Sequence, residues 1–188
     1  MICNPHIQPT IAMVATWPTG IVHPDQQEFL FDIGVEEILA VNYGDGDIVL
    51  GFNMLVQAYL MQPQRWPFVI FTENDVHPIK DKMGEFFEAD ADVICARYPT
   101  AGREDAWLWP DSFHSGFFWT RREVVRSLRP PWWRWQYNER GTAHIGCLCT
   151  IFKDRLEAEG FTFANAGQAR HEPKPQPARR VLRIRRAQ

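Results

Sequence analysis

Short runs of consecutive apolar residues recur along the chain, and each ends in polar or turn-forming residues. The run at 10–16 stops at W-P-T-G, and the run at 68–71 leads directly into Glu73, Asn74 and Asp75. Apolar runs that do not alternate with polar residues are typical of strands buried on both faces of a sheet. We therefore predict strands at 10–16, 36–44, 68–71, 91–99 and 115–120, with a final short extended stretch at 161–173.

Segments with helical spacing fill the intervals between these strands. Pro24 and early acidic residues open the segment 23–34, and Gly34 closes it, as helix ends prefer. Thr120 is a candidate helix cap, with Glu123 at the capping-box position. We predict helices at 23–34, 48–62, 78–90, 120–128 and 147–160. Alternating strands and helices predict an α/β domain with a mostly parallel central sheet flanked by helices.

The composition fits one globular domain. Of the 188 residues, 45% are hydrophobic and 23% are charged, which excludes a wholly disordered chain. No apolar run reaches the roughly 18–20 residues of a membrane helix, and the first residues lack the pattern of a signal peptide. Cys147 and Cys149 are one residue apart, which is wrong for a C-x-x-C zinc or redox site. With Cys3 and Cys95, we expect them to be reduced thiols in a cytoplasmic protein.

The formal net charge of -3 conceals an uneven distribution. Residues 174–188 hold six of the 20 Lys and Arg residues and no acidic residue. Residues 1–173 keep all 23 acidic residues and carry a net charge of about -9. We therefore divide the chain into a domain at 1–173 and a basic, flexible tail at 174–188. The tail is a docking arm for a polyanion, a solvated and partly disordered segment, or a segment that folds back on the acidic body.

Candidate chemistry lies where the strand at 68–71 ends. Ligands of open α/β sheets bind beyond the carboxyl ends of the strands, and Glu73, Asn74 and Asp75 occupy such an end. Two carboxylates one residue apart on an extended turn are able to face one hard cation, Mg²⁺ or Mn²⁺, together with a substrate diphosphate. The alternative is a polar strand-to-helix turn in which Asp75 or Asn74 caps the next helix.

Several motifs follow one another in a characteristic order. P-T-G and V-H-P follow the first strand, G-F-N-x-L-V lies in the helix at 48–62, and F-V-I-F-T-E-N-D-V precedes A-D-V-I-C-A-R-Y-P and S-G-F-F-W-T-R-R-E-V-V. Over roughly residues 10–171 this order resembles the small GT-A nucleotide-sugar glycosyltransferases of phages and bacteria. The resemblance implies a single Rossmann-like GT-A domain. It also implies metal-dependent transfer of a sugar from a nucleotide sugar to a hydroxyl acceptor, in the cytoplasm or, for a phage protein, in the host cytoplasm.

The resemblance also implies a metal and donor site. Glu73 and Asp75 match the acid-x-acid motif that binds Mn²⁺ or Mg²⁺ and the donor diphosphate, with glutamate in place of the first acid. His171 matches the late histidine that completes the metal site. Phe52 stands where the family has arginine. The implied donor-binding residues are Thr16, Pro18, Thr19, Gly20, Asn53, Glu73, Asn74, Asp75 and Gly116.

The family's catalytic base has no evident counterpart. Inverting members commonly carry a Glu-Asp pair before the motif A-G-F, and the corresponding positions here are Leu148 and Cys149. An inverting reaction needs a base for the acceptor hydroxyl, and the remaining candidates are His144, Asp105 and Asp111. A retaining mechanism, in which the leaving diphosphate acts as the base, needs none of them.

Tryptophan is concentrated on the expected acceptor side. Six of the eight tryptophans lie between Trp107 and Trp135, and aromatic faces stack on sugar rings and unpaired bases. The candidate acceptor-binding residues are Trp107, Trp109, His114, Trp132, Trp133 and Arg134. With the basic tail they suggest a DNA acceptor with a hydroxymethylated base; polysaccharide, lipid-linked and protein acceptors stay open. The alternatives are a hydrophobic lid over the sheet, or a degenerate transferase that only binds nucleic acid or glycan. The sequence does not indicate an oligomeric state.

Overall fold

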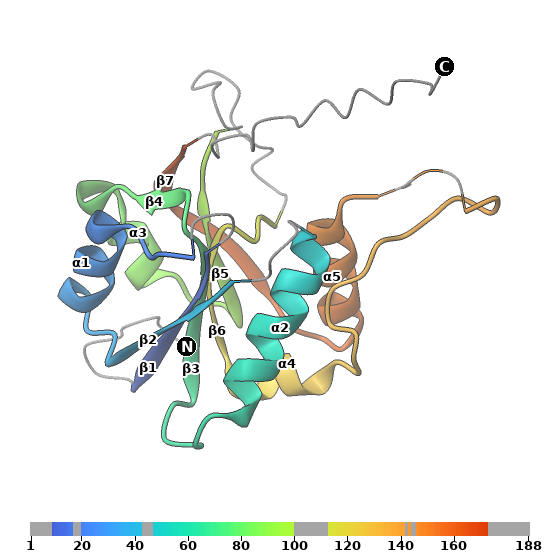
Figure 1. The fold of residues 1–188 in the computed structure, drawn as a ribbon, viewed down its shortest axis with the longest axis horizontal. Helices are drawn as coiled ribbons and strands as arrows, with labels where there is room; N and C mark the ends of the chain where they lie inside the picture. Colours follow the sequence, from blue (N-terminus) through green and yellow to red (C-terminus); the bar gives the residue numbers. More distant parts are fainter. Residues whose placement is uncertain are drawn as a thin grey trace, which may run out of the picture.

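The structure, a computed structural model, describes residues 9–16, 20–42, 47–99, 113–141, 143 and 146–172. Within these residues a seven-stranded sheet has the order β2-β1-β3-β6-β5-β7-β4 (Figure 1). Its strands are β1 Thr10–Ala15, β2 Glu37–Val41, β3 Phe68–Glu73, β4 Val76–Pro78, β5 Val93–Arg97, β6 Phe117–Arg121 and β7 Phe163–His171. The helices are α1 Pro24–Asp32, α2 Ile48–Met61, the 3-10 helix η1 Lys80–Lys82, α3 Gly84–Glu88, α4 Arg122–Ser127 and α5 Leu148–Ala158.

The α/β class is confirmed, with a sheet that is mixed rather than mostly parallel. The pairs β1–β2, β1–β3 and β5–β7 are parallel, whereas β3–β6, β5–β6 and β4–β7 are antiparallel. The antiparallel strand β6 inserts between β3 and β5. An apolar run reports burial on both faces of a strand and carries no information on its direction, so the sequence pattern did not reveal this reversal.

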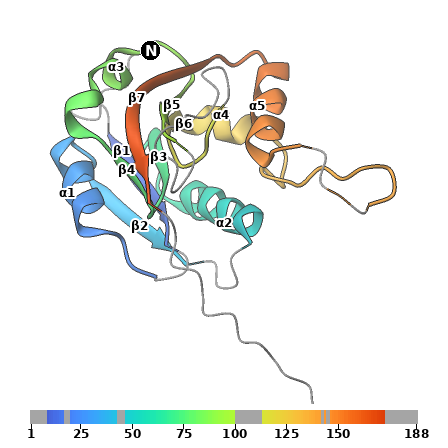
Figure 2. The same ribbon diagram turned by 90° about the horizontal axis from the view of Figure 1, so that it is seen from above.

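Helices cover both faces of the sheet, as Figure 2 shows: α1 and α3 lie on one side and α2, α4 and α5 on the other. Two separate hydrophobic cores result. Phe29 and Leu30 of α1 and Phe86 of α3 pack on the first face. On the second face, Phe52 of α2 and Phe152 of α5 share a core with residues of β1, β3 and β6. No helix among these residues is long and apolar enough to cross a bilayer.

Two local predictions were wrong. The segment 78–90 is not one helix, because the chain first runs through β4 and η1 and only then forms the short helix α3. The start of this segment, Pro78, is held in an extended conformation because β4 pairs with the end of β7. Thr120 does not cap α4: its hydroxyl donates to the carbonyl of Asp92 at 2.9 Å, and the cap residue is Arg121.

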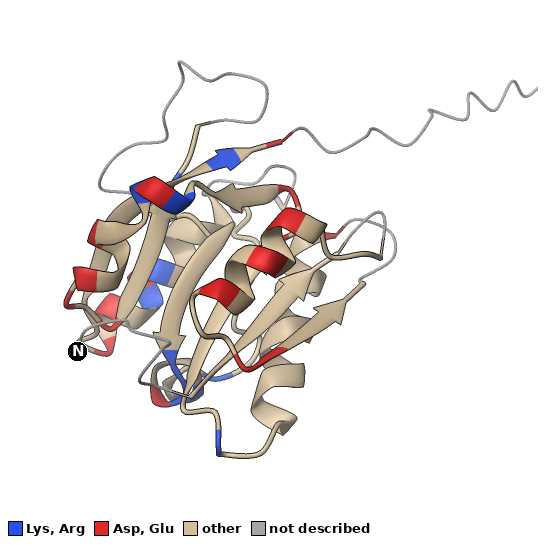
Figure 3. Cartoon of the chain, turned by 90° about the vertical axis from the view of Figure 1, so that its left-hand side faces the viewer, with Lys and Arg blue, Asp and Glu red and all other residues tan. Residues whose placement is uncertain are grey.

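The outer face of α1 is acidic (Figure 3). Asp25, Glu28 and Asp32 are exposed, while Phe29 and Leu30 are buried against the sheet. This is the division of faces expected of an amphipathic surface helix. Asp32 forms an ion pair with Lys80 of η1 at 2.6 Å, so α1 and η1 are joined at the surface.

Candidate functional site

Several strand ends meet at one edge of the sheet. Strands β1, β3, β5 and β7 point the same way, and their carboxyl ends carry Thr16, Glu73, Tyr98 and His171. Strand β6 runs in the opposite direction, so Gly116 precedes it at this same edge. The candidate site predicted from the sequence therefore lies where open α/β sheets bind their ligands.

Asp75 and His171 lie together at this edge. Nε2 of His171 is 3.4 Å from Oδ2 of Asp75, and the two side chains are 24% and 9% exposed. The backbone fixes their proximity, because Val76 of β4 pairs with His171 of β7 and the amide of Glu172 donates to the carbonyl of Asp75 at 2.8 Å. The His171 ring also contacts the Tyr98 ring edge to face, with 5.3 Å between centroids.

The turn that carries Asp75 is held from α1. The side-chain amide of Gln26 donates to the hydroxyl of Thr72 at 3.0 Å and to the carbonyls of Glu73 and Val76 at 2.8 and 2.9 Å. Sequence reasoning missed Gln26. The signal was present, however, because a glutamine stands on the helical face that is otherwise formed by apolar residues of α1, and a buried amide requires hydrogen-bond partners.

Asn74 connects the same turn to the end of β1. Its amide donates to the carbonyl of Ala15 at 2.9 Å, and its side chain donates to the carbonyl of Ile21 at 3.4 Å. The chain then continues into β4. The alternative in which Asn74 or Asp75 caps a following helix is therefore wrong.

Gly116 is packed closely against Tyr98 and Val76. Its amide donates to the hydroxyl of Tyr98 at 2.9 Å, and a Cβ atom at this position would lie 2.6 Å from that hydroxyl and 2.7 Å from Cγ2 of Val76. Its carbonyl accepts from the amide of Glu73 at 2.9 Å and from the Thr72 hydroxyl at 3.0 Å. Burial, and then the nearby Glu73 charge, raise the pKa of Tyr98 well above its usual value. A neutral phenol and a glycine thus fix the start of β6 beside Glu73.

Glu73 is buried but does not complete a metal cluster. Its side chain is 6% exposed. Among the residues that the structure describes, no three Asp, Glu, His or Cys side chains come together in a group able to hold a metal ion. Asp75 and His171 are therefore a pair of candidate ligands, and the predicted set of three is not assembled by protein side chains alone.

The loop after β1 begins at the same edge. Thr16 is fully buried, and its amide donates to the carbonyl of Val41 at 3.1 Å. Gly20 has a φ of 73°, and its amide donates to the carbonyl of Thr16 at 2.6 Å. This conformation suits glycine because a side chain would be strained there.

Asn53 of α2 and Trp133 are joined by two hydrogen bonds within the fold. The Asn53 side chain accepts from the amide of Trp133 at 3.1 Å and donates to its carbonyl at 2.8 Å. Trp133 is 0% exposed and stacks on Phe152, with 4.1 Å between ring centroids. This burial contradicts the prediction that Trp133 contacts an acceptor, and it agrees with the alternative of aromatic residues packed as a hydrophobic lid over the sheet. Asn53 thus fastens the segment 132–137, here called the aromatic loop, to α2. Its implied contact with the donor stays a prediction.

Other aromatic residues of this loop reach the surface. Trp132 is half-buried and Arg134 is exposed. A cavity of about 500 Å³ lies between the loop and α5, and it is lined by Arg134, Trp135, Gln136, Tyr137, Ile151, Asp154, Arg155 and Ala158. His114 lies elsewhere, with its ring 5.6 Å from that of Tyr98. The candidate acceptor residues therefore separate into one near Asp75 and a group beside α5.

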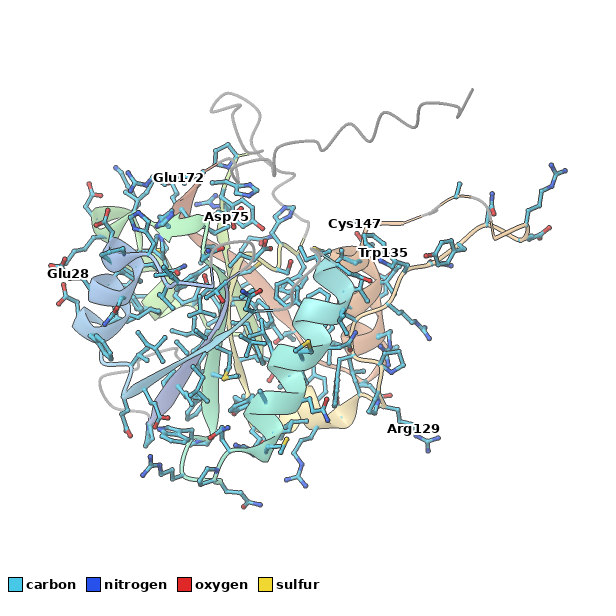
Figure 4. The ribbon with its side chains drawn as sticks, viewed as in Figure 1. Glu28, Asp75, Arg129, Trp135, Cys147 and Glu172 are labelled. Atoms are coloured by element: carbon cyan, nitrogen blue, oxygen red, sulfur yellow. The ribbon has the colours of Figure 1, made fainter. Side chains whose placement is uncertain are left out.

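Two cysteines lie at the start of α5, and Cys149 occupies one of the two positions at which a catalytic carboxylate was expected. Sγ of Cys149 lies 3.4 Å from Oγ of Ser115, directly before Gly116. Cys147 is exposed. Figure 4 shows Asp75, Glu172 and Cys147 along the same upper edge of the molecule. Sequence reasoning set these cysteines aside because their spacing was wrong for a C-x-x-C site.

Some predicted site residues lie outside the described residues. These are Pro18, Thr19, Asp105, Trp107, Trp109, Asp111 and His144, together with the tail at 174–188. Their roles stay predictions.

No protein-family model matches the sequence, and no curated protein matches it. Solved structures do match the fold. A197 from STIV has a TM-score of 0.57 at 13% identity over 86% of this chain and 83% of its own. The catalytic domain of Drosophila β1,4-galactosyltransferase 7 also has a TM-score of 0.57, at 16% identity over 84% of this chain.

The fold is GT-A-like. The chain spans 65% of the galactosyltransferase structure. The inositol-1-phosphate CTP transferase from T. maritima has a TM-score of 0.54 at 12% identity over 92% of each chain. This fold is thus shared with sugar transferases and nucleotidyltransferases, and at these identities the comparisons establish the fold alone.

Proposed function

We propose that this protein is a metal-dependent glycosyltransferase that moves a sugar from a nucleotide-sugar donor to a hydroxyl acceptor. The observation that carries the proposal is the pairing of Asp75 with His171, at 3.4 Å, at the ligand-binding edge of a GT-A-like sheet. Sequence motifs supplied the expectation of such a pair, and the contact joins residues from distant parts of the chain.

The side chains at this edge fit a divalent cation. Carboxylate oxygen and imidazole nitrogen are both ligands of Mn²⁺ and related metals, and such ions are commonly held by one or two protein groups plus substrate phosphates. Asp75 and His171 would hold the ion, with Glu73 at the end of β3 beside the donor. When bound, the cation stabilises the negative charge that forms on the leaving diphosphate. A Drosophila galactosyltransferase of similar fold has been solved with manganese, UDP-Gal and xylobiose.

The chain's own contribution is to hold these groups in place. Gln26 fixes the turn that presents Asp75, and β7 presents His171. We assign the donor base and ribose to the loop at 16–20. The acceptor proton goes to His144, Asp105 or Asp111 in an inverting reaction, or to the departing diphosphate in a retaining one.

Exposed groups of the aromatic loop favour a large, flat or charged acceptor. Trp132, Trp135 and Arg134 offer rings and a guanidinium at the surface, which suit a sugar polymer or an unpaired base with its phosphate. A hydroxymethylated base in DNA, bound with the help of the tail at 174–188, is the most specific acceptor that this chemistry supports. A polysaccharide or protein acceptor would use the same rings without the tail.

A second function is favoured by one specific observation. The positions at which a carboxylate pair was expected are Leu148 and Cys149, and both are buried or hydrogen-bonded within the fold. The lack of carboxylates at these two positions fits a degenerate transferase that binds nucleic acid or glycan without turnover.

The test is donor turnover by the full chain. A panel of nucleotide sugars is incubated with Mn²⁺ and mixed acceptors, and release of nucleoside diphosphate is measured. We expect release by the wild type and by Asp81→Asn, a control in the exposed helix η1. We expect a loss of at least about 100-fold in Asp75→Asn. Unchanged turnover in Asp75→Asn, or no consumption of any donor, would contradict the proposal. Release of pyrophosphate from a nucleoside triphosphate would indicate nucleotidyl transfer instead.

A further inference from the structure

Two thiols lie side by side at the beginning of α5. Cys147 is the N-cap residue of this 11-residue helix and is exposed to solvent. Cys149 lies within the first turn, and its thiol is within hydrogen-bonding distance of the Ser115 hydroxyl, 3.4 Å away. One sulfur therefore faces water, and its neighbour faces the interior of the candidate site.

The two thiols differ in protonation. A hydrogen bond from the Cys149 thiol lowers the pKa of Cys147 to about 6. The positive end of a helix dipole also favours a thiolate. The same hydrogen bond and burial raise the pKa of Cys149 well above its usual value. At neutral pH an exposed thiolate thus lies next to a protonated thiol.

Cys95 provides a contrast within the same chain. It is buried in β5, and its thiol lies 2.6 Å from the side-chain oxygen of Asn165. Burial raises its pKa to about 12. A protonated and inaccessible thiol does not react with oxidants, so Cys95 serves as an internal reference.

We propose that Cys147 and Cys149 form a reversible oxidation site that a peroxide converts into an intramolecular disulfide. An exposed thiolate next to a second thiol is the arrangement of a redox-sensing cysteine and its resolving partner. This inference does not depend on sugar transfer, although the pair adjoins the proposed transfer site.

The reaction balances in two steps. The Cys147 thiolate attacks one oxygen of hydrogen peroxide, the O–O bond breaks, and hydroxide leaves, so Cys147 becomes a sulfenic acid. The Cys149 sulfur then attacks the Cys147 sulfur; the S–S bond forms, the S–O bond breaks, and water leaves with the thiol proton. The two cysteines are oxidised by two electrons and the peroxide is reduced to water.

Disulfide formation would alter a hydrogen bond of Ser115, a residue at the edge of the candidate site. The Cys149 thiol donates its proton to Cys147 and accepts a hydrogen bond from the Ser115 hydroxyl. A Cys149 sulfur bonded to Cys147 is a weaker acceptor for that hydroxyl. Ser115 directly precedes Gly116, whose carbonyl accepts hydrogen bonds from the Glu73 amide and the Thr72 hydroxyl. Oxidation at the start of α5 therefore acts on the same backbone that positions the end of β3.

The test is a mass measurement on the full chain. The protein is treated with hydrogen peroxide, remaining thiols are blocked with iodoacetamide, and trypsin is added. Cleavage after Arg140 and Lys153 releases one peptide that contains Cys147 and Cys149 and no other cysteine. We expect this peptide to lose two hydrogen atoms and to resist alkylation, and dithiothreitol to restore both thiols. A peptide alkylated at both cysteines after peroxide, or one oxidised only to sulfinic acid, overturns the proposal.

Variants identify the role of each cysteine. In Cys149→Ser we expect a sulfenic acid at Cys147 that dimedone traps. In Cys147→Ser we expect Cys149 to react at least about tenfold more slowly, because its thiolate fraction is small. Cys3→Ser is the matched control and should form the disulfide as the wild type does. Equal oxidation rates at Cys149 with and without Cys147 would overturn the proposal. No donor is used, so failure of the transferase proposal would leave this result unaffected.

Discussion

Nε2 of His171 lies 3.4 Å from Oδ2 of Asp75, although the first is at the end of the last strand and the second follows β3. Pairing of β4 with β7 brings them together. The short strand β4 therefore has a function in the site: it turns the chain after Asp75 toward the end of β7.

We expect His171→Gln to weaken Mn²⁺ binding about 10- to 100-fold, because it removes one of two side chains that would hold the ion. Titration calorimetry of the full chain with Mn²⁺ and a nucleoside diphosphate measures the affinity. Asp81→Asn, in η1, should bind as the wild type does. Equal affinity in His171→Gln would place the metal elsewhere.

Gln26→Leu tests whether α1 positions the turn. The substitution removes donors to three oxygen atoms around Glu73, and loss of such buried hydrogen bonds costs about 1–3 kcal/mol. Urea denaturation measures the free energy of unfolding. Gln27→Leu is the matched control, since Gln27 is the exposed neighbour on the same helix. We expect it to change stability by less than about 0.5 kcal/mol. Similar losses in both variants would contradict the role of Gln26.

The central elements and the meeting of Asp75 with His171 were expected from the sequence, whereas the hydrogen bonds that hold the site together were not. The strand at 10–16 and the helices at 23–34 and 48–62 were placed correctly because their apolar patterns and end residues agree. The segment at 78–90 was misassigned because β4 is held by pairing with β7, a contact that local pattern does not encode. The burial of Gln26 was visible in the pattern of α1, but its three acceptors come from β3 and β4.

Trp133 shows the same limit for the aromatic residues. Six tryptophans close together in sequence suggested a common surface. The structure instead buries Trp119 and Trp133 completely, in the two different cores. Composition records how many rings are present, whereas the face that each ring occupies depends on elements far away in the chain.

Substitutions in the aromatic loop should therefore have different effects on stability at buried and at exposed positions. We expect Trp133→Ala to lower the free energy of unfolding by about 3–5 kcal/mol, because it removes a buried ring that packs between Phe52 and Phe152. Tyr137→Ala, at a 49% exposed position, should change stability by less than about 0.5 kcal/mol. Thermal and urea unfolding both report this difference. A mild effect of Trp133→Ala would show that the ring is not part of the core.

Cys147 should stay reactive at a lower pH than an ordinary cysteine. Because its pKa is lowered to about 6, the thiolate persists to lower pH than in an ordinary cysteine, whose pKa is about 8.5. We expect the alkylation rate of Cys147 to reach half its plateau near pH 6 in the wild type. In Cys149→Ser the midpoint should move upward toward the ordinary value. A midpoint that does not move would show that the neighbouring thiol is not responsible.

Gly116→Ala tests the close packing at the start of β6. The added methyl group would meet the Tyr98 hydroxyl at 2.6 Å and Val76 at 2.7 Å, and overpacking of this kind costs about 1–3 kcal/mol. Tyr98→Phe alone leaves the buried amide of Gly116 without its acceptor, at a cost of about 1–3 kcal/mol. The second change removes the nearest of the atoms that the new methyl group meets, although Val76 Cγ2 at 2.7 Å and the ring carbon Cζ of Tyr98 at 2.8 Å remain. The double variant should therefore be more stable than the sum of the two losses predicts, by about 0.5–1 kcal/mol. Urea denaturation of the four proteins measures this coupling. Strict additivity would mean that the cost of Gly116→Ala comes from contacts other than the Tyr98 hydroxyl, such as the contact with Val76.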